Sequence, residues 1–187
     1  MIPPSPYADR MTTLLRAWTA ADAQALVDAV ASTPDLVTQL PVEQLASAHD
    51  ARAFIARSLR SGSTQRIWAI VDDGVPVGSI ALTHIDPRHD TAWVSYWLAT
   101  AARGRGLATR ALAAAADWAL SRGDLFRLEL GHRVNNPASC AVASRAGFVP
   151  EGVERAKLRY GSERFDVELH ARLATDSRPD VSPLPRA

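Results

Sequence analysis

The stretch Arg103-Gly104-Arg105-Gly106-Leu107-Ala108 lies where a strand pattern gives way to a helix pattern. Residues 91–98 before it are rich in β-branched and aromatic residues, whereas residues 108–122 after it are nearly all good helix formers. Glycines let the backbone approach a ligand closely, and the first N–H groups of a helix have no internal partners. Because the helix dipole and two arginines add positive potential, this turn predicts a site for a phosphorylated cofactor.

The spacing of this loop distinguishes among phosphate motifs. A Walker loop requires Gly-Lys-Ser/Thr, but the single lysine is Lys157, and a dinucleotide fingerprint requires a third glycine where Thr109 stands. Arg103, Gly106 and Ala108 instead fill an Arg/Gln-x-x-Gly-x-Gly/Ala pattern. This pattern resembles the pyrophosphate loop of the GNAT acetyltransferases, a family that binds acetyl-coenzyme A.

Further motifs follow in the order that one branch of this family shows. Asn136-Pro137-Ala138-Ser139, Ala146-Gly147-Phe148 and Glu151-Gly152 resemble the signature of the ribosomal-protein N-terminal acetyltransferases, the RimJ/RimL-like branch. Residues 160–169 resemble its closing strand, and residues 15–22 resemble its opening strand and helix. The resemblance covers residues 12–173, most of the chain.

The element pattern predicts an α/β fold in one GNAT-like domain over residues 11–174. Residues 1–10 are expected to be a flexible lead and residues 175–187 a disordered tail, since both segments are rich in proline. The resemblance implies a mixed, mostly antiparallel central sheet, splayed between the strands at 91–98 and 125–131, with helices on both faces. The expected strands are 12–18, 66–71, 75–82, 91–98, 126–130, 148–155 and 165–172, and the main helices are 19–30, 47–60, 108–122 and 137–146.

Composition narrows the class of protein. The net charge of +1 gives no basis for binding nucleic acid or a membrane surface, and no apolar run reaches membrane-spanning length. A single cysteine, Cys140, allows no internal disulfide, which favours a cytoplasmic location. The five histidines and this cysteine show no ligand spacing in the sequence, so no metal site is expected.

The resemblance implies that the pantetheine arm of acetyl-coenzyme A lies in the splayed gap and pairs with the main chain at Trp97, Leu98 and Ala99. Asn136 is expected to cap a helix, and the resemblance adds a contact with the cofactor arm, although capping alone explains the residue. The phosphate loop is expected to comprise Arg103, Gly104, Arg105, Gly106, Leu107, Ala108 and Thr109.

Ser139 is the first candidate catalytic residue. The resemblance implies that its hydroxyl hydrogen-bonds to the departing thiolate, while the alternative is an ordinary serine in the first turn of a helix. Trp93 stands where many relatives carry a glutamate, so the usual general base is missing. The remaining candidates are His84, Glu129 and His132, and a base acting through water is the alternative.

The sequence therefore predicts an N-acyltransferase that moves an acetyl group from acetyl-coenzyme A to a primary amine. The acceptor is either a protein N-terminal α-amine or a small-molecule amine, and residues 34–59 and 155–164 are expected to shape its pocket. Two alternatives stay open: the same fold using another donor such as succinyl-coenzyme A, and a non-catalytic acyl-coenzyme A sensor. The sequence names no acceptor and leaves a homodimer open.

Overall fold

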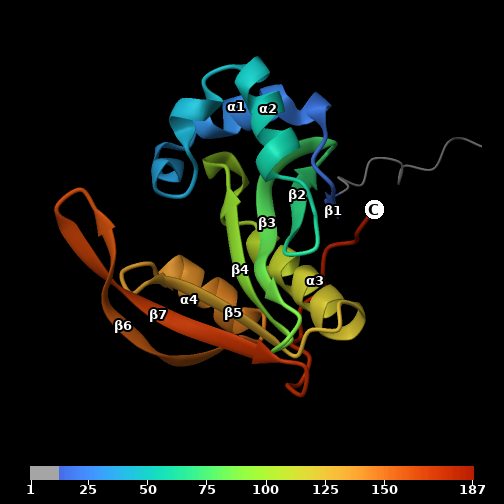
Figure 1. The fold of residues 1–187 in the computed structure, drawn as a ribbon, viewed down its shortest axis with the longest axis vertical. Helices are drawn as coiled ribbons and strands as arrows, with labels where there is room; N and C mark the ends of the chain where they lie inside the picture. Colours follow the sequence, from blue (N-terminus) through green and yellow to red (C-terminus); the bar gives the residue numbers. More distant parts are fainter. Residues whose placement is uncertain (1–12) are drawn as a thin grey trace, which may run out of the picture.

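The computed structural model describes residues 13–187, in which a seven-stranded sheet is flanked by helices on both faces (Figure 1). The predicted lead, residues 1–10, lies outside the described residues. Every neighbouring pair of strands is antiparallel except β4 and β5, which run parallel. In sheet order the strands are β1 (Leu14–Arg16), β2 (Arg66–Asp72), β3 (Val75–Asp86), β4 (Thr91–Leu98), β5 (Arg127–Arg133), β7 (Glu163–Leu173) and β6 (Val149–Tyr160).

Each face of the sheet buries its own apolar cluster. One cluster lies under α1 (Ala23–Ala31), α2 (Ala48–Ser58) and the short 3-10 helices η1 (Ala20–Asp22), η2 (Pro34–Thr38) and η3 (Val42–Leu45). The other lies under α3 (Leu107–Arg122) and α4 (Pro137–Arg145). The α/β class and the helices on both faces confirm the sequence prediction.

Strand β4 contributes alternately to both clusters, as the period of two in a strand requires. Trp97 lies in the cluster under α1 and α2, whereas Val94 and Leu98 lie in the cluster under α3. Helix α3 packs closely on its side because its buried face is made of small residues at helical spacing, among them Ala111, Ala115 and Ala119.

The predicted splay between β4 and β5 is present (Figure 1). The two strands pair only from Thr91 to Trp93 in β4, and beyond that point they diverge. A Cβ added to Gly131 of β5 would lie 3.1 Å from the indole of Trp93 and 2.8 Å from Val167. Trp93 therefore packs over β5 at the vertex of the gap, where a bulkier residue than glycine would force the ring aside.

The C-terminal segment differs from the prediction of a disordered tail over residues 175–187. Its last residues run beside β1, where Leu15 donates to the Pro185 carbonyl (2.8 Å) and accepts from the Ala187 N–H (2.9 Å). Leu184 is 3% exposed within the α3 cluster. Proline and polar content suggested disorder, but an extended segment can still cover a short edge strand and bury one leucine.

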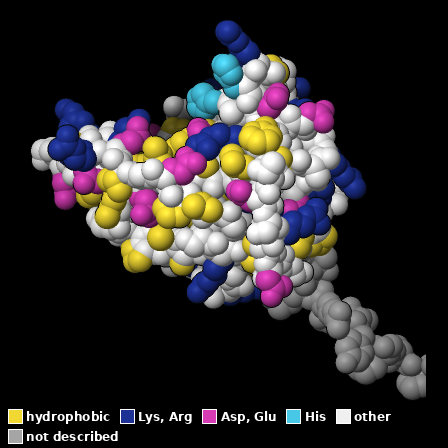
Figure 2. Space-filling view, turned by 90° about the horizontal axis from the view of Figure 1, so that it is seen from below, with side chains coloured by type: hydrophobic (Ala, Val, Ile, Leu, Met, Phe, Trp, Pro, Cys, Tyr) yellow, Lys and Arg dark blue, Asp and Glu magenta, His cyan; other side chains and the backbone are white. Residues whose placement is uncertain are grey.

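The β6–β7 hairpin is longer than its sequence pattern indicated. Its strands continue to Tyr160 and back from Glu163, so residues 155–164, expected to be a loop near the acceptor pocket, form its far end. None of the helices within residues 13–187 is long and apolar enough to cross a membrane. Acidic and basic side chains are interspersed over the face in Figure 2, in keeping with the net charge of +1.

Candidate active site

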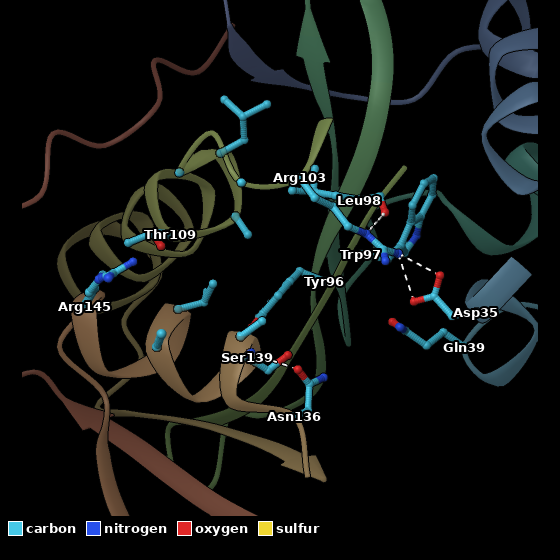
Figure 3. A pocket seen from close by; sticks show the side chains of 17 residues that line it. Asp35, Gln39, Tyr96, Trp97, Leu98, Arg103, Thr109, Asn136, Ser139 and Arg145 are labelled. Carbon is cyan, nitrogen blue, oxygen red and sulfur yellow. Dashed lines mark hydrogen bonds and ion pairs between the residues drawn. The ribbon is translucent and has the colours of Figure 1, made fainter. Parts of the chain in front are cut away.

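A cleft of about 360 Å³ lies at the end of β4, where the start of α3 and one side of α4 face the helical region η2 (Figure 3). It brings together most of the residues that the sequence singled out. Ala99 and Arg105 do not line it. The predicted residues that line the cleft are Trp97, Leu98, Arg103, Gly104, Gly106, Leu107, Ala108, Thr109, Asn136 and Ser139.

The start of α3 forms an open cradle at one end of this cleft. Gly104 and Gly106 have φ values of +76° and +74°, in the left-handed region that glycine adopts without strain. A Cβ added at either glycine would meet no protein atom within 4 Å, so the space beside them is open to a ligand. Gly106 is also the N-cap residue and offers no side-chain cap. The first residues of α3, Leu107, Ala108 and Thr109, line the cleft, and no side chain of the described residues caps their N–H groups.

The two arginines of the loop bind carboxylates of the protein itself. Arg103 donates from Nε to the Leu98 carbonyl oxygen (3.1 Å) and from Nη2 to both oxygens of Asp35 (3.0 and 2.9 Å). Arg105 forms an ion pair of 2.6 Å with Asp72, away from the cleft. These pairs hold the loop in place, and they leave its glycines and the uncapped start of α3 open to a ligand.

A further cation enters the cleft from α4. Arg145 lines it near Thr109 of α3 (Figure 3), and the described residues offer Arg145 no carboxylate partner. The sequence reasoning missed this residue. A signal was present, because Ala138, Val142 and Arg145 follow one another at helical spacing and therefore share one face of α4.

The edge of β4 that faces the gap carries unpaired main-chain groups. Ala99 donates its N–H to Val77 of β3 (2.8 Å), so this predicted contact is already in use. Since the hydrogen-bonding direction alternates along a strand, Leu98 and Tyr96 direct their main-chain groups to the opposite side, where β5 has diverged. The Leu98 carbonyl accepts from Arg103, whereas its N–H has no strand partner within residues 13–187, because the pairing with β5 ends at Trp93.

Two hydroxyl groups meet at the middle of the cleft. Ser139 is held in the first turn of α4, where its N–H donates to the Asn136 side chain (3.1 Å), so the predicted helix cap is present. Its hydroxyl lies beside that of Tyr96, a residue that sequence reasoning did not select (Figure 3). Burial raises the pKa of Tyr96 above its usual value, and the neighbouring Ser139 hydroxyl only partly offsets this rise. Tyr96 therefore stays a neutral phenol that can donate to Ser139.

The three candidate bases lie outside the cleft. His84 is exposed and contacts Thr83 (3.2 Å), and Glu129 forms an ion pair with Arg127 (2.6 Å). His132 is buried beside His170, with 3.1 Å between their Nε2 atoms. His84 lies on β3 and the other two lie on β5, and the spacing along the chain could not show which of them reaches the gap.

Comparison with known proteins agrees with the family resemblance of the sequence motifs. Residues 12–149 match the family model described as the acetyltransferase (GNAT) domain. The chain is 32% identical over 108 residues to a ribosomal-protein-serine acetyltransferase of Escherichia coli, an alignment that covers 58% of this chain and 60% of that protein. The matches to two further curated relatives cover 55% and 61% of the length of those proteins, so the chain spans about three fifths of the length of the curated relatives it matches.

Solved structures extend the likeness over nearly the whole chain. The structure of RimL, a ribosomal alpha-N-protein acetyltransferase in complex with coenzyme A, is 27% identical with a TM-score of 0.78, and the match covers 92% of this chain and 97% of that one. An acetyl transferase of Salmonella typhimurium that modifies the N-terminal serine of a 50S ribosomal subunit protein is 26% identical. Its TM-score is 0.73, with 88% of this chain and 96% of that one covered.

Proposed function

The chain belongs to the GNAT acetyltransferase family, and from this premise we propose that it transfers an acetyl group from acetyl-coenzyme A to a primary amine. One observation carries the proposal. The glycine-fronted start of α3 opens into the same cleft as the unpaired edge of β4 and the Ser139 hydroxyl. An anion site, a strand edge that can pair with amides, and a polar group between them are what an acyl-coenzyme A requires.

The pyrophosphate is assigned to the N-terminus of α3. Gly104 and Gly106 leave room for phosphate oxygens, and the free N–H groups that follow them would donate to those oxygens. Arg145 supplies a full positive charge at the same end of the cleft. Arg103 has a different role, since its bonds to Asp35 and Leu98 fix the loop against β4. The proposed pyrophosphate site thus depends on backbone groups and on α4 more than on the loop arginines.

The pantetheine arm is assigned to the gap beside β4. Its amides would pair with the main-chain groups that Tyr96 and Leu98 turn away from β3. This pairing uses main chain only, and it is compatible with the burial of the Trp97 ring against Trp18 in the opposite cluster. The arm then brings the thioester toward the middle of the cleft, where Ser139 lies.

Bound acetyl-coenzyme A supplies an activated thioester whose carbonyl carbon a neutral amine attacks directly. The N–H of Tyr96 also points into the gap and is a backbone donor for the oxyanion that develops there, which leaves the Leu98 N–H to the arm. The Ser139 hydroxyl donates to the sulfur as the C–S bond breaks, and Tyr96 donates in turn to Ser139. Each of these groups acts from a position that helix α4 or strand β4 already fixes.

The proton released by the amine is assigned to water. Among the described residues, the only carboxylate that lines the cleft is Asp35, and both its oxygens accept from Arg103. Trp93, which packs at the vertex of the gap, stands where many relatives carry a glutamate, and no carboxylate of residues 13–187 other than Asp35 lines the cleft in its place. Positioning of the amine beside the thioester then supplies most of the rate, and the amine must lose its proton before it attacks.

The decisive experiment measures release of coenzyme A thiol from acetyl-coenzyme A with a chromogenic disulfide. The acceptor panel contains peptides with free N-terminal α-amines and small primary amines, and a blank without acceptor corrects for Cys140. Acceptor-dependent release is expected, with N-terminally acetylated peptides inactive. Binding of acetyl-coenzyme A without turnover of any amine would favour the sensor, and preference for succinyl-coenzyme A in competition would favour the other donor.

We place this reaction in the cytoplasm, because a chain with one cysteine is suited to a reducing compartment and acetyl-coenzyme A is supplied there. Protein N-terminal amines head the acceptor panel because relatives of this chain are named for acetylating ribosomal proteins. The panel itself decides between these amines and small molecules.

A further inference from the structure

Four side chains with metal-ligating atoms converge on the sheet face beneath α4, separate from the lining of the cleft. They are His132 of β5, Cys140 of α4, and Glu168 and His170 of β7. One ligand atom from each lies within 4.8 Å of all the others. Both imidazoles are nearly inaccessible to water, with 4% and 1% of their side chains exposed.

The distances fit a tetrahedral site. The two Nε2 atoms are 3.1 Å apart, and Oε2 of Glu168 lies 3.0 Å from Nε2 of His170 and 3.3 Å from Nε2 of His132. Zinc bound at ~2.0–2.1 Å to nitrogen or oxygen places two donors of a tetrahedron about 3.3–3.4 Å apart. The fourth donor is the Cys140 thiol, whose sulfur lies within 4.8 Å of the other three ligand atoms. Three donors already have nearly the spacing that a bound ion would impose.

The outer nitrogens of both histidines are oriented as in metal sites. Nδ1 of His132 lies 3.1 Å from the Arg133 carbonyl oxygen, and Nδ1 of His170 lies 3.5 Å from that of Phe148. A carbonyl oxygen only accepts, so each contact favours the proton on Nδ1 and leaves the Nε2 lone pair facing inward. Metal-bound histidines show this arrangement, in which the second nitrogen donates to a backbone carbonyl.

The sheet register explains how these residues meet. His132 lies directly opposite Glu168 in the antiparallel pair of β5 and β7, and His170 is two residues further along the same face. Helix α4 crosses this face and adds Cys140 (Figure 1). The spacing along the chain gives no metal motif because the donors come from three elements. The sequence therefore predicted no metal site, and only the pairing of β5 with β7 makes one visible.

We propose that His132, Cys140, Glu168 and His170 bind one Zn²⁺ ion in a closed, structural site. Nitrogen, sulfur and carboxylate donors in a tetrahedral arrangement suit Zn²⁺ better than Mg²⁺ or Ca²⁺, which require more oxygen ligands. Four protein donors leave no position for substrate, so the ion has no direct part in acyl transfer. Without a metal ion, a proton on the Nε2 atom of one histidine can form only some of the hydrogen bonds among these side chains at a time. A cation at the centre would bind all four donor atoms at once.

The ion would tie α4 to the sheet beside the cleft. Cys140 is the residue after Ser139, so the bond from its sulfur fixes the first turns of α4, which carry Asn136 and Ser139. It would also join β5 to β7 at the point where β5 has left β4 and has lost that neighbour. Metal binding should therefore raise the stability of this half of the molecule.

The first test titrates the full chain, stripped with a chelator and kept reduced, with Zn²⁺ against a chromogenic chelator and with Co²⁺ in a spectrophotometer. One equivalent of either metal should bind. Co²⁺ should give the visible bands of a tetrahedral complex and a thiolate-to-cobalt charge-transfer band. Absence of stoichiometric binding to the folded protein would refute the proposal, as would Co²⁺ spectra without the thiolate band.

Variants identify the donors. Cys140→Ser keeps the size of a partly exposed side chain, and it should lose the charge-transfer band and weaken Zn²⁺ binding by tenfold or more. Glu168→Gln is a second partly exposed variant with the same expected direction, so the result does not depend on a buried histidine change that unfolds the protein. His84→Ala, at an exposed histidine outside the cluster, is the matched control and should bind Zn²⁺ unchanged.

Thermal unfolding provides an independent readout. Zn²⁺ should raise the Tm of the wild-type chain and of His84→Ala, and it should raise that of Cys140→Ser less. An equal rise in all three would indicate binding elsewhere and would contradict the assignment. Neither readout needs an acceptor amine, so the zinc site can fail while the proposed acetyltransferase stands, or the reverse.

Discussion

The hydroxyl pair of Tyr96 and Ser139 offers the sharpest test of the proposed chemistry. If Ser139 donates to the departing thiolate, Ser139→Ala should lower kcat on the order of tenfold, which is about 1.4 kcal/mol of barrier. Tyr96→Phe keeps the ring that lines the cleft and removes only the hydroxyl beside Ser139, which we propose donates to Ser139 during the reaction. A hydrogen bond of this kind contributes about 0.5–1.5 kcal/mol, so kcat should fall about 2- to 12-fold.

The double variant decides whether Tyr96 acts through Ser139. Since the Tyr96 hydroxyl then has no other task, Tyr96→Phe should cost nothing further once Ser139 is alanine, and the double variant should equal Ser139→Ala. Coenzyme A affinity, measured by calorimetry, should stay within about twofold of wild type in all three variants, because the change acts on the leaving sulfur. Multiplied losses in the double variant would show that the two residues act separately. An unchanged kcat in Ser139→Ala would return Ser139 to a purely structural role.

Three further changes test the rest of the site. Gly106→Asn places a side chain in the cradle with less strain at φ +74° than other residues, and it should abolish coenzyme A binding in calorimetry while circular dichroism shows a folded chain. Arg145→Gln should weaken coenzyme A binding by tenfold or more and reduce its salt dependence, whereas Arg52→Gln, at an exposed arginine of α2, should do neither. A hydrogen bond from Arg105 holds the pKa of Asp72 below its usual value, so Asp72 stabilises the fold above its unfolded pKa, and this stability is lost as pH falls through the lower folded value. Asp72→Asn should therefore lower the free energy of unfolding by about 1 kcal/mol at pH 7 and by less in acid, as urea unfolding at both pH values can measure. Turnover should also rise with pH until the acceptor amine is neutral, and a basic limb that shifts with a single side chain would contradict the water-mediated proton loss.

The local structure of the loop at Arg103–Ala108 could be predicted because its physics is local. A left-handed turn, a helix start and open space beside it are all properties of a few consecutive residues, and Gly104 and Gly106 show the positive φ that their type suggests. The same locality explains why the Asn136 cap was predicted correctly. The direction of a long side chain is different, since Arg103 could bind a phosphate or a carboxylate, and only the fold shows that Asp35 lies within its reach.

Contacts between elements account for what the sequence did not reveal. In the sequence, Tyr96 is one aromatic residue of a strand, and only the structure shows that α4 places Ser139 beside it. Leu184 is a single leucine in a polar tail, and only the structure shows that this tail runs beside β1. Both depend on which elements are neighbours, and no periodicity along the chain encodes that. The candidate bases His84 and Glu129 lie outside the cleft for the same reason, because the sequence shows the chemistry of a side chain but not its position in the fold.

Helix α4 shows how one element can serve two sites whose ligands differ. Successive residues of a helix point about 100° apart, so Ser139 and Cys140 face different neighbours although they are adjacent in the chain. Ser139 turns toward β4 and the cleft, whereas Cys140 turns toward the face shared by β5 and β7. The splay of the sheet makes both possible, because β5 leaves β4 to open a gap on one side while it keeps β7 on the other. Whatever fixes α4 against β7 therefore also sets the distance from Ser139 to β4, and the precision of the proposed acyl-transfer site depends on contacts that no substrate touches.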